Sequence, residues 1–141
     1  LMVRTLRRLR AAGIRTVALT NNFATPELGT GAAQAAADAE HAKFVALFDG
    51  FIESVVVGYT KPDPRMYQLA LEFLKVEPGQ TAFLDDIGLN LKPAKAMGIR
   101  TVLVKNDTDT DFHGAVRALS KLTGVKLLDG DEETVPVEAK L

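Results

Sequence analysis

Four short strand-like runs alternate with helical segments along this chain, and this alternation limits the folds open to it. The runs are residues 16–19, 51–54, 81–84 and 101–104. Runs of this length and mostly apolar character suit strands that are buried on both faces. Strands that alternate with helices imply right-handed crossovers between parallel neighbours. The sequence therefore predicts an α/β fold, a mainly parallel sheet with helices on both faces.

The intervening segments carry apolar residues at helical spacing. A helix should begin at Pro64, because Asp63 can cap its N-terminus and proline is favoured at the first position. Its expected buried stripe is Met66, Ala70, Phe73 and Leu74. Asn90 is expected to cap the next helix, which should end at Gly98. The other helices are predicted at 2–12, about 31–47 and 111–122.

Composition narrows the class of protein. With 141 residues, 47% of them hydrophobic, the chain has the size and apolar content of one globular domain, and its net charge of -1 favours neither nucleic acid nor an anionic membrane as a partner. There is no cysteine, which excludes disulfides and thiolate metal sites and fits a cytoplasmic location. No apolar stretch approaches the roughly 20 residues that span a bilayer. Residues 1–128 are expected to form the domain and 129–141 a loose polar tail.

Polar residues with complementary chemistry follow three of the expected strands. Thr20 ends the first, Lys61 follows the second, and the adjacent carboxylates Asp85 and Asp86 end the third. Ligands bind at the carboxyl ends of parallel strands, so these residues should meet in one crevice. Two neighbouring carboxylates call for a positive partner, and a lysine, a hydroxyl and a carboxylate pair suit a phosphoryl group neutralised by Mg²⁺.

The motifs resemble those of the haloacid dehalogenase (HAD) superfamily. Leu-Thr-Asn at 19–21, Gly-Tyr-Thr-Lys-Pro-Asp-Pro at 58–64 and Phe-Leu-Asp-Asp-Ile-Gly-Leu-Asn at 83–90 are similar to its second, third and fourth motifs. Within the superfamily, the chain looks most like the N-terminal phosphatase domain of soluble epoxide hydrolases and the related domain of some acyl-CoA dehydrogenase family proteins.

The resemblance implies a role for each matching residue. Thr20 and Asn21 would bind the phosphoryl group of a small phosphorylated substrate, and Lys61 would steady both the nucleophile and the phosphoryl charge. Asp86 would ligate Mg²⁺, and Asp85 would act through a water molecule or orient the metal's surroundings. Substrate choice in this superfamily usually depends on a cap between the first and second motifs, a region that would lie upstream of Leu1.

The first motif is the main departure from the family pattern. Family members attack phosphorus with an aspartate of an Asp-x-Asp motif at the end of a central strand. Asp107-Thr108-Asp109 has this spacing, but it follows the fourth motif and would need a circularly permuted architecture, so we reject it. The chain would then be the C-terminal part of a HAD core with a gap in its sheet, or the strands ending at Leu19 and Leu84 would pair directly into a four-stranded sheet. In either case we expect it to be catalytically silent alone.

Other functions remain open or are disfavoured. A non-catalytic scaffold or partner-binding module fits the missing motif, and a 2-haloacid dehalogenase is a further alternative, although the carboxylate pair favours phosphatase chemistry. In phosphoacceptor receiver domains the aspartate pair comes first in the chain, whereas here it comes last. His41 and His113 have no matching nucleophile and are expected to be solvated. The oligomeric state cannot be predicted from these features.

Overall fold

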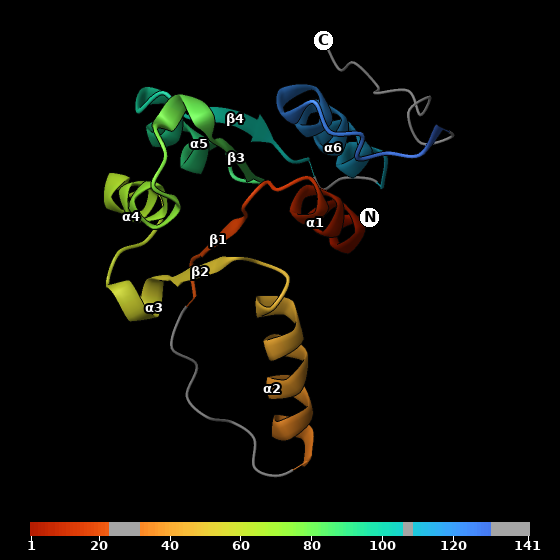
Figure 1. The fold of residues 1–141 in the computed structure, drawn as a ribbon. Coiled ribbons are helices and arrows are strands. Elements are labelled where there is room, and N and C mark those ends of the chain that lie inside the picture. Colours follow the sequence, from red (N-terminus) through yellow and green to blue (C-terminus); the bar gives the residue numbers. More distant parts are fainter. Residues whose placement is uncertain (23–31, 106–108, 131–141) are drawn as a thin grey trace.

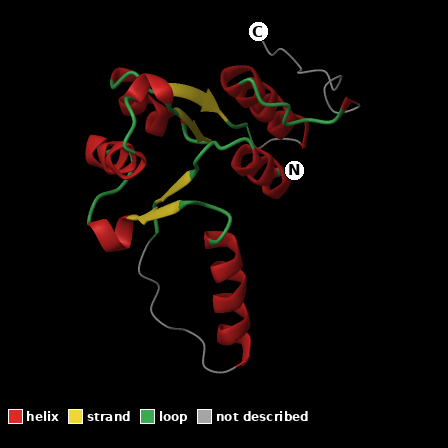
Figure 2. Ribbon diagram, viewed as in Figure 1, coloured by secondary structure: helices red, strands yellow, loops and turns green. Residues whose placement is uncertain are grey.

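A computed structural model describes residues 1–22, 32–105 and 109–130. Helices and strands alternate along the chain (Figures 1 and 2). The strands are β1 (Val17–Thr20), β2 (Gly50–Glu53), β3 (Ala82–Asp85) and β4 (Arg100–Leu103). The helices are α1 (Met2–Ala11), α2 (Ala32–Val45), α3 (Ser54–Val57), α4 (Pro64–Leu74), α5 (Gly88–Ala96) and α6 (Asp109–Thr123), with a 3₁₀ turn at Pro78–Gln80.

The strands form two parallel pairs. In one pair β1 lies beside β2, with Val17 opposite Gly50, and in the other β3 lies beside β4, with Ala82 opposite Arg100. Among the described residues β1 and β3 are not hydrogen-bonded to each other, so of the two alternatives direct pairing into a four-stranded sheet is wrong, and the gap in the sheet is observed. The parallel α/β prediction is confirmed, and the sheet is interrupted between β1 and β3.

Helices pack on both faces of the β3–β4 pair. On one face, Tyr67 of α4 and Ala94 of α5 form an apolar cluster that Phe83 of β3 and Leu19 of β1 join. On the other face, α1 and α6 contribute a cluster that Ala82 and Leu84 join. Successive residues of β3 thus point to opposite faces, as in a strand covered on both sides. The cluster around Tyr67 connects the two strand pairs through side chains.

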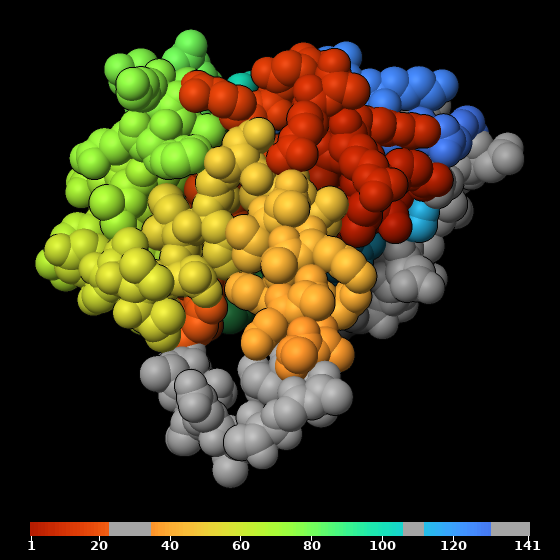
Figure 3. Space-filling model, turned by 60° about the horizontal axis from the view of Figure 1, so that its bottom comes forward, coloured from red at the N-terminus to blue at the C-terminus, as the bar shows by residue number. Residues whose placement is uncertain are grey.

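Helix α2 differs from the other helices. Its residues 35–44 are exposed, and it extends away from the sheet (Figure 1) and lies at the surface of the face in Figure 3. Toward its C-terminal end, His41 and Phe44 join a ring cluster with Phe48, which follows the helix; the three rings surround Phe51 at centroid distances near 6 Å. The alanine-rich composition therefore produces a helix without a core-facing stripe.

Several local expectations need correction. Helix α5 begins at Gly88, so Asn90 lies inside its first turn and does not cap it. Ser54, expected at a strand end, instead begins the short helix α3. Phe73 is 50% exposed rather than buried, because its ring lies over Gly50 of β2 at the surface. In contrast, the Asp63 cap is confirmed: its carboxylate accepts the backbone N–H of Arg65.

Candidate active site

The carboxyl ends of β1 and β3 meet the loop that follows α3. Asn21, directly after β1, makes two hydrogen bonds to the backbone of Lys61: its side-chain amide donates to the Lys61 carbonyl at 2.9 Å, and its side-chain oxygen accepts the Lys61 N–H at 2.8 Å. This arrangement fixes the start of the Lys61 side chain relative to the end of β1. Residues 40 positions apart in the chain are thereby joined at one edge of the sheet.

Lys61 forms an enclosed ion pair with Asp85. The lysine Nζ lies 2.7 Å from Oδ2 of Asp85, and the two side chains are only 12% and 5% exposed. Oδ1 of Asp85 accepts the Ile87 N–H at 2.9 Å and the Asn90 side-chain amide at 3.0 Å. A buried carboxylate is tolerated where it is paired and hydrogen-bonded in this way. The structure therefore brings Lys61, Asp85 and Asn21 together.

The loop between Lys61 and α4 is held by a second charged group. The Arg65 guanidinium pairs with Asp63 at 2.6 Å, and it stacks on the Tyr59 ring with its carbon 4.0 Å from the ring centroid. The hydrogen bonds from the Arg65 side chain and backbone lower the pKa of Asp63 to about 2. Asp63 therefore stays ionised at neutral pH as the cap of α4. The Lys61–Pro62 peptide bond in this loop is cis.

Thr20 ends β1, and its hydroxyl donates to the side-chain oxygen of Asn22. Asn22 is itself fixed, since its backbone N–H donates to the Ser54 hydroxyl at 2.9 Å and its amide donates to Glu53 at 2.8 Å. The threonine hydroxyl is therefore oriented by a network that joins the ends of β1 and β2. Asn22 and Ser54 were not among the sequence candidates, because neither belongs to a motif that the residue pattern singles out.

Asp86 differs from Asp85 in its surroundings. Asp86 is exposed beyond the end of β3, whereas Asp85 is buried. Its oxygen is a hard ligand of the kind that Mg²⁺ prefers, and Mg²⁺ sites commonly use one or two carboxylates, with water and phosphate completing the shell. Within the described ranges no three His, Cys, Asp or Glu residues are grouped to hold a metal ion. The residues present thus fit Mg²⁺ in the type of ligand that they offer.

Two residues that the sequence analysis did not assign to the site support Asp85. Asn90, taken as a helix cap, directs its amide to that carboxylate, and its backbone carbonyl accepts the hydroxyl of Tyr67. The burial of Tyr67, with a contribution from the charge of Asp85, raises the pKa of Tyr67 to about 12. The position of Asn90 in the motif at 83–90 was the available signal for its role.

The Asp-x-Asp triplets do not supply the missing nucleophile at a described strand end. Asp107 and Thr108 lie outside the described residues, and Asp109 begins α6. Two further triplets, Asp109-Thr110-Asp111 and Asp129-Gly130-Asp131, have the same spacing. The first lies at the start of α6. Asp129 of the second follows α6 and pairs with Arg4 at 3.2 Å and Arg8 at 2.7 Å on α1.

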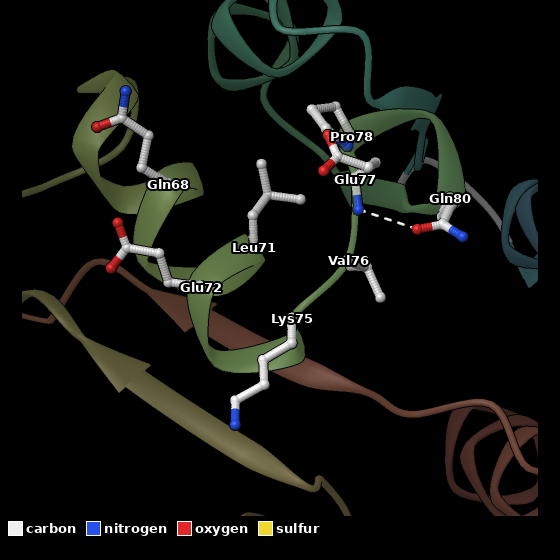
Figure 4. Close-up of a pocket in the computed structure, with 8 residues that line it drawn as sticks. All are labelled: Gln68, Leu71, Glu72, Lys75, Val76, Glu77, Pro78 and Gln80. Atoms are coloured by element: carbon white, nitrogen blue, oxygen red, sulfur yellow. Dashed lines mark hydrogen bonds between the residues drawn. The ribbon is translucent and has the colours of Figure 1, made fainter.

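A pocket of about 440 Å³ lies apart from these residues, between the C-terminal half of α4 and the turn after it. Figure 4 shows Leu71 and Glu72 on one wall and Glu77 with Pro78 on the other. None of the candidate residues lines this pocket, and it is open to solvent, so we place the candidate site at the strand ends instead.

Fold and site together define the class of protein: a parallel α/β core with a lysine–carboxylate pair at the carboxyl ends of its strands. The family comparison agrees, because residues 2–98 match the model of the haloacid dehalogenase-like hydrolases. The chain therefore belongs to the haloacid dehalogenase-like hydrolase family.

Relatives place the chain among longer proteins. It is 43% identical over 120 residues to bifunctional epoxide hydrolase 2 of Sus scrofa, covering 85% of this chain and 20% of that protein. It is 38% identical over 136 residues to acyl-CoA dehydrogenase family member 10 of Mus musculus, covering 96% of this chain and 11% of that protein. Phosphatase MT3486 of Mycobacterium tuberculosis is 39% identical over 84 residues, covering 60% of this chain and 37% of the phosphatase. The chain thus spans a fifth or less of the length of the first two relatives.

Solved structures support the fold. An uncharacterized protein from Corynebacterium glutamicum superposes with a TM-score of 0.68 at 23% identity, covering 89% of this chain and 82% of the other. At this level of identity the likeness shows a shared fold and does not assign a reaction.

Proposed function

We propose that this chain carries the phosphoryl-binding and cation-binding part of a magnesium-dependent phosphate monoesterase. The observation that carries the proposal is the enclosed Lys61–Asp85 pair, held against the end of β1 by Asn21 and bordered by Asp86. Lysine beside acidic oxygen ligands at the carboxyl ends of parallel strands suits a transferring phosphoryl group. The kinship with a mycobacterial phosphatase supports the same class of reaction.

Each residue has a proposed task in that reaction. Thr20 and Asn21 hold phosphoryl oxygens at the end of β1, and Lys61 offsets the negative charge that develops there. Asp86 is the proposed magnesium ligand, and Asp85 orients the lysine. The cation, when bound, supplies neutralisation of phosphoryl charge and orientation of the substrate.

The nucleophile is proposed to come from a strand between β1 and β3. Support comes from the interruption of the sheet, since the two strand pairs are not hydrogen-bonded to each other in the described structure. A strand inserted there would bring its own carboxyl end beside Thr20 and Asp85. An aspartate at that point would attack phosphorus and displace the alcohol of the ester, and water would then hydrolyse the aspartyl phosphate, which releases inorganic phosphate and restores the carboxylate.

The assay measures hydrolysis of a simple aryl phosphate with and without Mg²⁺. It compares two proteins: the 141-residue chain alone, and the same chain joined behind a segment that supplies the Asp-x-Asp strand. We expect no hydrolysis by the chain alone and magnesium-dependent hydrolysis by the joined protein. Asp86→Ala in the joined protein should abolish this magnesium-dependent hydrolysis. Hydrolysis by the chain alone would overturn the proposed need for a further strand.

The alternatives make different predictions in the same assay. A 2-haloacid dehalogenase would release halide from a 2-haloacid without Mg²⁺. A non-catalytic module would show neither activity after the strand is supplied, and its Mg²⁺ binding would be absent or unchanged by Asp86→Ala. The neighbouring carboxylates Asp85 and Asp86 favour the phosphatase over the dehalogenase, because carboxylate oxygens are ligands that Mg²⁺ prefers.

A further inference from the structure

Both carboxylate oxygens of Asp85 accept hydrogen bonds from donors inside the protein. Lys61 bonds one oxygen, and the Ile87 N–H and the Asn90 amide bond the other. Hydrogen bonds to a charged group contribute more than neutral ones, and an ionised carboxylate accepts through two oxygens with about four lone-pair sites. The carboxylate is therefore oriented from both sides.

Asn90 is the side chain that connects this carboxylate to the core. It is 5% exposed and reaches back from the first turn of α5 to Asp85, five positions earlier. Its backbone carbonyl accepts the hydroxyl of Tyr67, which is 1% exposed on α4. The Tyr67 ring packs edge-on against Phe83 of β3, with centroids 5.2 Å apart. A continuous path of contacts thus runs from the core to the ammonium of Lys61.

We propose that Asn90 is a positioning residue: with Tyr67 behind it, Asn90 holds Asp85 in the ion pair with Lys61 and keeps that carboxylate out of direct contact with the cation. The part that concerns the cation rests on the proposed function. Two adjacent aspartates thereby take different tasks, Asp85 orienting the lysine and Asp86 meeting the metal. The difference follows from what bonds Asp85: three donors take three of its roughly four lone-pair sites, and the positive charge of Lys61 beside the remaining site repels a cation.

The first test follows the ammonium protons of Lys61 by NMR, without metal. In the unmodified chain we expect slow exchange of these protons with water, as for an enclosed ion pair. In Asn90→Leu the exchange should be at least about tenfold faster, since a donor to the partner carboxylate is lost. An unchanged rate in a folded Asn90→Leu chain would overturn the proposal.

Tyr67→Phe is the second variant, and it tests the same path if Asn90→Leu fails to fold. It removes only the hydroxyl and keeps the ring packed against Phe83. It should accelerate the exchange in the same direction by a smaller factor, about threefold, because it acts one contact further back. Tyr59→Phe is the matched control, since Tyr59 is the other of the two tyrosines and its ring stacks on Arg65 instead. Equal effects of the two tyrosine variants would contradict the proposed path.

The second test adds Mg²⁺ and follows the carboxyl carbons of Asp85 and Asp86 by ¹³C NMR. We expect only the Asp86 signal to move in the unmodified chain, and both signals to move in Asn90→Leu. Equal movement of both signals in the unmodified chain would overturn the proposed division of tasks. Movement of neither signal in any variant would count against the magnesium site of the proposed function, while the ammonium exchange would still decide whether Asn90 positions Asp85.

Discussion

The side chain of Lys61 makes its strongest contact with a residue 24 positions away, and both partners are enclosed. A charge pair in this position differs from the surface pairs of the same chain. Lys43 and Glu40 on α2 are also 2.7 Å apart, but each side chain is about three-quarters exposed. Solvent and side-chain entropy reduce an exposed pair to a small net effect, whereas removing one member of an enclosed pair leaves an uncompensated charge.

Lys61→Met should therefore lower the free energy of unfolding by about 3–5 kcal/mol, because Asp85 is left buried without its cation. Urea denaturation measures the change. Lys43→Met is the control, for which we expect a change of less than about 0.5 kcal/mol. Adding Asp85→Asn to Lys61→Met should recover part of the loss; an equal loss in the two single lysine variants would refute the distinction.

The hydroxyl of Tyr67 gives a pH-dependent contribution. Its pKa is raised from 10.0 to about 12 by burial and by the charge of Asp85, so the folded state favours the neutral hydroxyl. The stabilisation is complete below pH 10 and is lost as the pH rises through about 12. Ultraviolet titration of Tyr59→Phe, in which Tyr67 is the remaining tyrosine, should show ionisation near pH 12; a midpoint near 10 would contradict the burial of the Tyr67 hydroxyl beside Asp85.

At the scale of elements, sequence signals predicted helix ends correctly where neighbouring residues alone set the backbone geometry. Asp63 followed by Pro64 begins α4 as predicted, because the cap and the proline act within one turn. Phe73 was predicted to be buried from its helical spacing, but β2 and its glycine lie beneath it at the edge of the molecule. The spacing of apolar residues identifies the face of a helix that points inward. It does not determine how much of that face the neighbouring element covers.

Gly50 allows this contact between β2 and α4. A Cβ at this position would lie 2.5 Å from the Phe73 ring, but the ring is half exposed and can turn outward. Gly50→Ala should therefore cost about 1 kcal/mol, the lower end of the range for overpacking. Thermal and urea unfolding measure it, and Phe73→Leu should remove most of the penalty.

Gly79→Ala is the matched control, since no atom lies within 4 Å of its added Cβ. We expect this change to be neutral or slightly stabilising. A penalty for Gly50→Ala that persists in the Phe73→Leu background would show that the ring is not its cause.

For the whole molecule, the interruption between β1 and β3 is the main tertiary feature. Every residue of β1 and β2 is only partly buried, although strands in the middle of a parallel sheet are normally covered on both faces. The cluster around Tyr67 keeps the two strand pairs near one another through side chains rather than through backbone hydrogen bonds. Within the described part of the chain, β1 and β3 are each paired with a strand on one side only.

Amide hydrogen exchange should test this one-sided pairing. Successive N–H groups of a strand point to opposite sides, so about half of the amides of β1 and β3 should exchange fast and the others slowly. Supplying the strand proposed above should protect the fast group. Uniform slow exchange in the chain alone would mean that β1 and β3 pair in solution.

The sequence by itself determined the α/β class, the order of the elements and the strand ends at which polar residues gather, because these depend on periodicity and on turn chemistry within short segments. The motif resemblance pointed to the family, which the family model confirmed over residues 2–98. Among the described residues no helix has the length and apolar character to cross a bilayer, and the cytoplasmic location and the partners stay predictions.

Only the tertiary structure decided which of the candidate residues form ion pairs and hydrogen bonds with one another. The sequence presents Asp85 and Asp86 as an equivalent pair, but the fold buries one against Lys61 and Asn90 and leaves the other exposed. It also decided that β1 and β3 stay apart. Both outcomes depend on contacts between segments distant in the chain, and neither the spacing of apolar residues nor local propensity specifies such contacts.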